Sequence, residues 1–233
     1  MVVLNKKEFF NGVKSALPIV MGYMPLGLAF GVLARATGLS VFETTAMSVL
    51  VYSGSGQFIA VSLLGAGASV LTIIATTFLV NSRYMLLSAS LSPYLRNIPT
   101  GFLAFFSFEI TDETFGVGLN HWQNNKANQA YMLGLHLTSH LAWITSSIIG
   151  ASIGNFITDI ERLGLNFALP SMFIALLIMQ LKGKNSLFVA LIAGLISLTV
   201  SIFSQSSWNI ILGTIAAASV GVIIEKWKPK SSS

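Results

Sequence analysis

The amino-acid sequence is dominated by apolar windows about as long as a membrane-crossing helix. A helix needs about 20 apolar residues to cross roughly 30 Å of hydrocarbon. On this scale the 233 residues contain about eight candidate segments, at 14–35, 43–65, 69–94, 101–119, 130–153, 166–181, 186–204 and 207–225. The connections between them are short. We therefore expect an all-α, polytopic integral membrane protein with seven to eight membrane segments, forming one transmembrane domain over residues 1–233.

The charge content supports the same interpretation. Only 9% of the residues are charged and 54% are hydrophobic, whereas soluble domains carry about 25% charged residues. So few charges cannot cover a water-exposed surface, which excludes a soluble protein. The chain has no cysteine, so disulfides and thiolate metal sites are excluded as well. We expect neither a metal nor another cofactor.

The basic residues indicate an orientation. Eight crossings would put both termini on one side of the membrane, together with every lysine of the chain: Lys6, Lys7, Lys14, Lys126, Lys182, Lys184, Lys226, Lys228 and Lys230. The other side would receive Arg35, Arg96 and Arg162. The positive-inside rule then makes segments 1–13 and 226–233 cytoplasmic, in a bacterial cytoplasmic membrane. A re-entrant hairpin at 43–65 or 69–94 would change the number of crossings.

A polar stretch, Ser53-Gly54-Ser55-Gly56-Gln57, interrupts the second window. Each glycine disfavours a continuous helix by about 1 kcal/mol relative to alanine. Unwound backbone at membrane depth is tolerated only where it is buried in protein or lines a cavity. We therefore expect a broken helix at mid-membrane and a candidate binding site, although close helix packing stays open as an alternative. Gly27 with Gly31 and Gly150 with Gly154 have small-xxx-small spacing, which predicts helix packing.

Ionisable residues interrupt two further windows. Asn81 and Arg83 lie in the third, and the fourth contains Glu109, Asp112 and Glu113 at i, i+3 and i+4, on one helical face. Each ionised group at the bilayer centre costs about 2.5–3.5 kcal/mol, so such groups point inward, pair, or line water. Arg83 is expected to pair with Asp112 or Glu113. Some of the acids could be only structural partners of this arginine.

Together these groups predict a site for a zwitterion, because the positive end of a half-helix attracts an anion. Free N–H groups near Ser55, Gly56 and Gln57, with Asn81 and Arg83, would hold a carboxylate. Asp112 or Glu113 would hold an ammonium group, and Tyr23 could face the cavity. Candidate proton-coupling residues are Glu109, Asp112, Glu113 and His136. His136 and His140 share one helix face, where helix packing is the simpler interpretation, and no further metal ligands accompany them.

Four stretches in order identify a resemblance: "SALPIVMGYMPLGLAFGVLA" from residue 15, "GSGQFIAVSLLGAGAS" from 54, "TTFLVNSRYMLLSASLSPYL" from 76 and "FEITDETFG" from 108. They resemble the AzlC family, the large subunits of bacterial branched-chain amino acid exporters. The resemblance implies a non-enzymatic permease that exports L-valine, leucine, isoleucine and methionine with a small AzlD-type membrane subunit. Many members have alanine at the position of Ser55 and histidine at that of Tyr84, which implies that backbone groups carry the site near residue 55.

Two other functional classes compete with this interpretation. An intramembrane serine protease would use Ser55 as nucleophile and His136 or His140 as base. A channel or a structural membrane subunit is the second alternative, although a channel would more naturally show a repeated filter or a charge ring. For a transporter the proton-motive force is the expected energy source, because no Walker-type phosphate loop occurs in the sequence.

Overall fold

The computed structural model describes residues 5–157 and 184–203, together with single positions 164, 167, 170, 171, 174, 177, 178, 181 and 219. These residues form helices and short connections, with no β-strand among them. The chain divides into two compact units, Met1–Met172 and Phe173–Ser233. The expected segment at 207–225 and the tail at 226–233 lie outside the described residues, apart from position 219, and 166–181 is described only at isolated positions. One transmembrane domain therefore stays a prediction.

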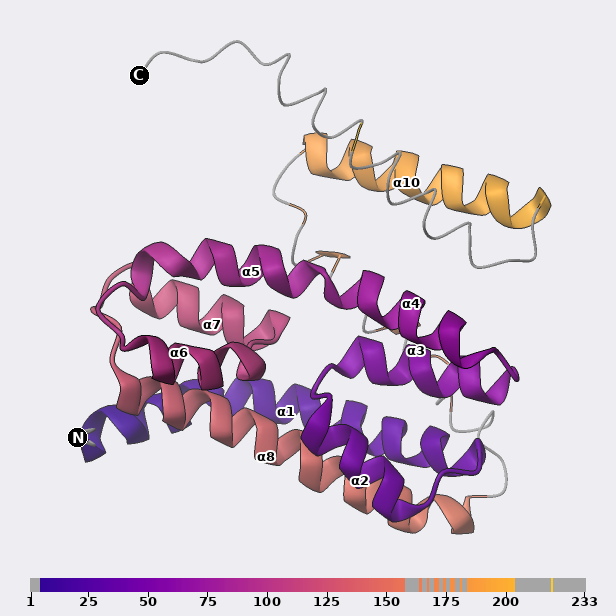
Figure 1. The fold of residues 1–233 in the computed structure, drawn as a ribbon, viewed down its shortest axis with the longest axis horizontal. Coiled ribbons are helices and arrows are strands. Elements are labelled where there is room, and N and C mark those ends of the chain that lie inside the picture. Colours follow the sequence, from indigo (N-terminus) through magenta and orange to yellow (C-terminus); the bar gives the residue numbers. More distant parts are fainter. Residues whose placement is uncertain are drawn as a thin grey trace. The chain divides into compact units, whose positions relative to one another are not determined.

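Two long helices, α1 (Lys6–Ala36) and α8 (Gln129–Ile153), form the scaffold of the first unit. Glycines let their backbones touch: a Cβ on Gly31 would overlap the Ser147 carbonyl, and one on Gly150 would overlap the Leu28 carbonyl. The start of α1 contacts the start of α8, and the end of α1 contacts the end of α8. The two helices therefore run parallel (Figure 1). The packing role predicted for Gly27, Gly31, Gly150 and Gly154 is confirmed.

The window at 43–65 forms a hairpin of two short helices, α2 (Val41–Leu50) and α3 (Gly54–Gly65). α2 starts beside the end of α1, and α3 returns to that end, where a Cβ on Gly65 would lie 2.9 Å from Thr37 Cγ2. This window therefore turns back. The expectation of unwound backbone over Ser53–Gln57 is corrected: the unwound residues are Val51–Ser53, and Gly54 begins the first turn of α3 because the Ser53 hydroxyl caps it.

The window at 101–119 also turns back, although a crossing was expected there. It consists of α6 (Thr100–Phe106), the 3-10 turn η2 (Ser107–Glu109) and α7 (Asp112–Trp122). The His121 ring at the end of α7 stacks on Tyr131 in the first turn of α8, with ring centroids 3.7 Å apart. Phe106 contacts His136, and Glu109, further along the chain, contacts His140. The segment that contains α6 therefore runs along α8 toward the middle of that helix.

A capping box explains why this second hairpin breaks where it does. The Thr111 side chain accepts from the Thr114 N–H, and the Thr114 hydroxyl accepts from the Thr111 N–H, which starts a new helix at Asp112. Glu109 precedes the break and Asp112 follows it. The prediction that Glu109, Asp112 and Glu113 share one helical face is therefore wrong, since they do not lie on one helix.

The third window forms α4 (Val70–Asn81), α5 (Arg83–Leu91) and the 3-10 turn η1 (Ser92–Tyr94), which follow one another with a junction at Ser82. This stretch, Val70–Tyr94, and α1 are the two helical segments in the described residues that are long and apolar enough to cross a membrane. In the second unit, α10 (Lys184–Phe203) is a 20-residue helix.

The two hairpins enter the first unit from opposite ends of α8 (Figure 1). Their tips, Val51–Ser53 and Ile110–Thr111, approach each other at the middle of that helix. There the Tyr52 ring stacks on His140 with centroids 3.9 Å apart, and Glu109 contacts the same histidine. Tyr52 has a φ of 41°. This left-handed conformation costs a non-glycine residue of order 1–3 kcal/mol and persists only where the surrounding structure holds it. The fold thus places two irregular backbone segments face to face.

Candidate functional site

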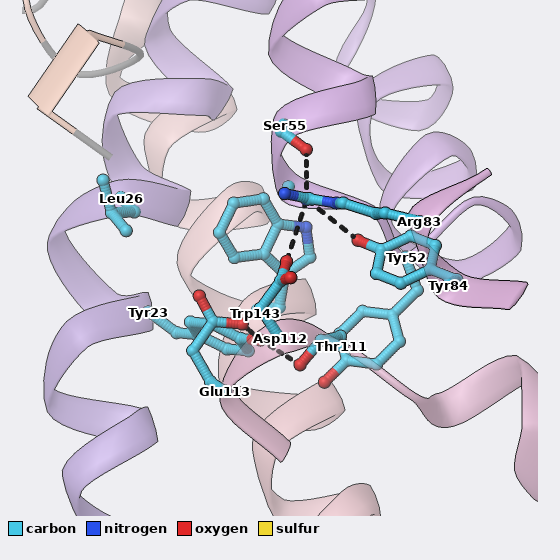
Figure 2. Close-up of a pocket in the computed structure, with 11 residues that line it drawn as sticks. Tyr23, Leu26, Tyr52, Ser55, Arg83, Tyr84, Thr111, Asp112, Glu113 and Trp143 are labelled. Carbon is cyan, nitrogen blue, oxygen red and sulfur yellow. Dashed lines mark hydrogen bonds and ion pairs between the residues drawn. The ribbon is translucent and has the colours of Figure 1, made fainter. Parts of the chain in front are cut away.

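A pocket lies between the two hairpin tips, α1, α5 and α8 (Figure 2). Tyr23 and Trp143, near the middles of the two scaffold helices, border it. Most of the side chains that line it are polar or charged: Tyr23, Tyr52, Ser55, Arg83, Tyr84, Thr111, Asp112 and Glu113. Gly54 contributes backbone only. The apolar part of the wall consists of Leu26 and the Trp143 ring. The pocket therefore combines both signs of charge with an apolar side.

Arg83 is the cation of the pocket. Its Nη2 lies 2.9 Å from Asp112 Oδ2 and donates to the Ser55 hydroxyl at 2.7 Å (Figure 2). The guanidinium also lies 5.2 Å from the centre of the Tyr84 ring, within cation–π range. The pairing predicted for Arg83 is thus present, with Asp112 as the partner. The pair is partly accessible to solvent, with 25% of the arginine and 12% of the aspartate side chain exposed.

Asp112 and Glu113 occupy the first turn of α7, where the positive end of a helix favours carboxylates. Tyr23 from α1 donates its hydroxyl hydrogen to Glu113 Oε2 at 2.8 Å. The same hydroxyl accepts from Thr111 Oγ1, also at 2.8 Å (Figure 2). Tyr23 therefore ties the second hairpin to the scaffold and faces the pocket, as the sequence suggested.

The start of α3 contributes backbone donors. Gly54 and Ser55 open its first turn, so their N–H groups have no acceptor within the helix. Ser53 lies behind them, where its hydroxyl donates to Asn81 Oδ1 at 2.7 Å and accepts from the Gly56 N–H. Of the predicted site residues, Ser53, Gly56 and Asn81 thus hold the tip in place and do not line the pocket.

Gln57 also lies behind the wall. Its Oε1 accepts from Trp143 Nε1 at 2.9 Å, and its Nε2 donates to Ser48 Oγ at 3.2 Å. The side chain is fully buried and links both arms of the first hairpin to α8. Gln57 therefore positions the indole that forms the apolar wall. The sequence analysis singled out the glutamine and missed its partner.

Glu109 and the two histidines are separate from the pocket lining. Glu109 Oε1 lies 3.1 Å from His140 Nδ1, and His140 Nε2 lies 3.0 Å from the Ser48 carbonyl oxygen. His136 Nδ1 donates to the Met132 carbonyl, and its ring packs against Phe106. The structure thus brings Glu109 together with His140, while His136 contacts none of the predicted acids. Within the described part of the chain no group of His, Cys, Asp or Glu could hold a metal ion.

The arrangement does not suit a serine protease. The Ser55 hydroxyl accepts a hydrogen bond from Arg83, and a guanidinium cannot act as a base because it stays protonated. His136 and His140 bond to other partners and are not among the residues that line the pocket. Ser55 thus has no base among its described contacts.

Several lining residues were missed by sequence reasoning. Thr111, Tyr52 and Tyr84 each stand next to a residue that had been singled out, so proximity in sequence to Asp112, Ser53 and Arg83 was the available signal. Leu26 and Trp143 have no such signal, since apolar side chains are common in membrane helices.

Comparisons with known proteins agree with this picture. The model of the AzlC protein family matches residues 18–157. A membrane protein of Archaeoglobus fulgidus is 31% identical over 227 residues, covering 96% of this chain and 97% of the relative. The inner membrane protein YgaZ of Escherichia coli is 30% identical over 199 residues, 82% of this chain and 81% of YgaZ.

A third relative carries a functional name. The branched-chain amino acid transport protein AzlC of Bacillus subtilis is 26% identical over 186 residues, covering 78% of this chain and 72% of that protein. No solved structure matches the chain. The family model covers more than half of the sequence and includes both hairpins and the pocket, so this chain is a membrane protein of the AzlC family.

Proposed function

We propose that this chain is the large subunit of a secondary transporter that exports L-valine, leucine, isoleucine and methionine across the bacterial cytoplasmic membrane. The proton-motive force drives it, and a small AzlD-type subunit assists it. The name of the Bacillus subtilis relative supports branched-chain amino acid transport.

The Arg83–Asp112 pair carries the proposal. An α-amino acid has a carboxylate and an ammonium group on one carbon. Inserted between the two side chains, its carboxylate takes the place of Asp112 beside Arg83, and its ammonium takes the place of Arg83 beside Asp112. The exchange leaves no charge unpaired, which matters because an unpaired charge in a low-dielectric site is strongly unfavourable. Free N–H groups of Gly54 and Ser55 supplement the carboxylate site, and Glu113 supplements the ammonium site.

The apolar wall accounts for the side chain of the substrate. Leu26 and the Trp143 ring border the same pocket as the charged pair. Burial of a valine or leucine side chain contributes about 1.5–3 kcal/mol. A glycine or serine substrate would lose most of this term while keeping the charge contacts, so selectivity follows from the wall rather than from the pair.

Protons are the proposed coupling ion, and acids near the pocket are the groups that could carry them. Asp112 and Glu113 contact the substrate site directly, and Glu109 lies at the tip of the second hairpin. His136 takes no part in this coupling, because its ring nitrogen bonds a backbone carbonyl and its ring makes a T-shaped contact with Phe106.

Counterflow in proteoliposomes tests the function. The chain is reconstituted with and without its small subunit, the vesicles are loaded with unlabelled amino acids, and entry of labelled valine is followed. We expect leucine, isoleucine and methionine inside the vesicle to accelerate entry, glycine and lysine to have no effect, and the small subunit to be required. A transporter that ignores branched-chain substrates, or one fully active alone, contradicts the corresponding part of the proposal.

The same vesicles address the channel alternative. Alternating access predicts that valine flux saturates with concentration and that a related amino acid competes with it. Flux through a pore rises in proportion to the gradient and shows no acceleration by substrate on the far side. Linear flux without counterflow would therefore favour the channel.

A further inference from the structure

The tips of both hairpins meet at one buried histidine. His140 and Glu109 are 8% and 3% exposed. The Ser48 carbonyl oxygen that faces His140 Nε2 belongs to the last turn of α2, in the first hairpin. Glu109, which faces Nδ1, is the last residue before the break in the second hairpin. The imidazole ring therefore bridges two segments that approach it from opposite ends of α8.

The bonding partners fix how many protons this bridge holds. A carbonyl oxygen only accepts, so Nε2 must carry a hydrogen. The contact between Nδ1 and the carboxyl oxygen, at 3.1 Å, then needs one more hydrogen, on either atom. The bridge is complete as imidazolium with carboxylate or as neutral ring with carboxylic acid, and both forms contain the same number of protons.

Loss of that proton breaks the bridge. A neutral imidazole has one N–H, so it can serve Ser48 or Glu109 but not both. If it keeps Ser48, the ring lone pair faces an ionised carboxylate. If it keeps Glu109, the lone pair faces the carbonyl oxygen. The proton leaves to water, and in either case one hairpin loses its hydrogen bond to His140.

Glu109 has one buried carboxyl oxygen outside the bridge. Its Oε2 is buried and has no hydrogen-bond partner in the described residues. A permanently ionised carboxylate in such a place would be strongly disfavoured unless further donors surrounded it. A carboxyl that is neutral in part of a cycle avoids this penalty.

Other charged or ionisable groups surround the bridge. Tyr52 stacks on His140 and interacts electrostatically with Glu109. His136 lies one turn earlier on α8 and turns toward Phe106. Arg83, Asp112 and Glu113 line the pocket that Tyr52 also lines. Tyr52 therefore connects the bridge to the proposed substrate site.

From this geometry we infer that Glu109 and His140 bind one exchangeable proton, and that this proton holds the tips of the two hairpins together. The role of that proton in driving amino acid export rests on the proposed function, whereas the proton-dependent bridge does not. His140 and Ser48 act on the tips and do not touch the substrate.

Distances between the tips test the bridge directly. The natural chain has no cysteine, so spin labels attach only to the two introduced cysteines, Val51→Cys and Ser107→Cys. Both positions are exposed. Val51 belongs to the first tip, and Ser107 lies shortly before the second. In otherwise unchanged protein we expect one short distance at acid pH and a second, longer distance at alkaline pH. An unchanged distribution over the whole range overturns the inference.

Glu109→Gln separates the bridge from other titrations. The glutamine amide can donate to Nδ1 while the ring N–H stays on Ser48, so no exchangeable proton is needed. We expect the short distance at every pH. The matched control is Glu43→Gln, because Glu43 is exposed and caps α2 in a capping box that glutamine also forms, and it should keep the pH-dependent change. If the distance in spin-labelled Glu109→Gln changes with pH as it does in the spin-labelled protein with Glu109, the inference is overturned. If Glu109→Gln does not insert into the membrane, the pH dependence of the spin-labelled protein with Glu109 decides.

Transport gives an independent readout. Acid-inside vesicles with the small subunit should accumulate valine, up to about tenfold for each pH unit and exchanged proton. We expect this accumulation to be lost in Glu109→Gln and kept in Glu43→Gln. Absence of valine transport by the unmodified protein would reject the proposed function while leaving the distance result in place. Full accumulation in Glu109→Gln would reject the coupling role alone.

Discussion

Among individual residues, Asp112 has the most direct proposed role, since it pairs with Arg83 and would receive the substrate ammonium. Replacement by asparagine removes the charge but keeps an oxygen that can accept from the guanidinium. We therefore expect Asp112→Asn to insert normally and to lose valine export by about 10- to 100-fold, the size of a charge-assisted hydrogen bond of ~1.5–3 kcal/mol. Efflux from valine-loaded cells measures the loss, and membrane immunoblots measure insertion. Undiminished efflux would reject the role of Asp112, and Glu43→Gln is the control.

Ser55 is expected to matter less. Its hydroxyl accepts from Arg83, but Arg83 retains Asp112 as a partner, and the backbone N–H of residue 55 survives substitution. Ser55→Ala should lower the initial rate of valine efflux by no more than about tenfold, the effect of ~1.5 kcal/mol. Ser62→Ala, on an exposed position of the same helix, is the matched control. Complete loss in Ser55→Ala alone would indicate chemistry at the hydroxyl.

Sequence reasoning found the charged residues of the site because burial of a charge is costly and needs a reason. Arg83, Asp112, Glu113 and Tyr23 were predicted to face the pocket, and they do. The same reasoning could not separate Gln57 and Asn81, which support the wall from behind, from residues that line it. A polar residue in a membrane segment indicates a polar partner. It does not indicate whether the side chain faces the pocket or lies behind the residues that line it.

At the scale of helices, the small residues of α1 and α8 were interpreted correctly because their spacing has one simple use. The hairpins were harder. The window at 101–119 has the length of a crossing, and its break depends on the reciprocal bonds of Thr111 and Thr114. Those bonds start a helix without fixing the direction in which it leaves. The direction is set by packing against α8, between residues far apart in sequence.

Close contact between α1 and α8 can be tested with two glycines of the same helix. A Cβ on Gly31 meets backbone atoms of Ser147 and Ala151, which cannot move aside easily, whereas a Cβ on Gly22 meets nothing within 4 Å. Gly31→Ala should lower the free energy of unfolding by about 1–3 kcal/mol, as overpacking does. Gly22→Ala should leave it unchanged or raise it by up to about 1 kcal/mol through helix propensity. Thermal unfolding in detergent compares the two, and equal midpoints would contradict the packing.

For the whole molecule, the parallel packing of α1 and α8 constrains the topology. Two parallel helices that both cross a membrane must have an odd number of crossings between them. We predict that α1 and α8 both cross and that the hairpins at 41–65 and 100–122 are re-entrant, so that Val70–Tyr94, which is long and apolar enough, is the single crossing between them. In this predicted topology the irregular hairpin tips lie at membrane depth, where they are tolerated because protein surrounds them. This arrangement moves Arg96 to the side of the N-terminus and of Lys126, which agrees better with the positive-inside rule than eight crossings do.

The absence of cysteine makes this topology directly measurable. Single cysteines at Ala66, Asn97 and Asn125, all exposed in connections, are labelled with a membrane-impermeant maleimide in whole cells and in inverted vesicles. If both hairpins are re-entrant and the N-terminus is cytoplasmic, Ala66→Cys reacts in whole cells, and Asn97→Cys and Asn125→Cys react in inverted vesicles. Eight crossings predict the reverse for Ala66 and Asn97 and the same result for Asn125. Asn125→Cys therefore serves as the internal reference, and labelling of Asn97→Cys from outside the cell would mean that the second hairpin crosses the membrane after all.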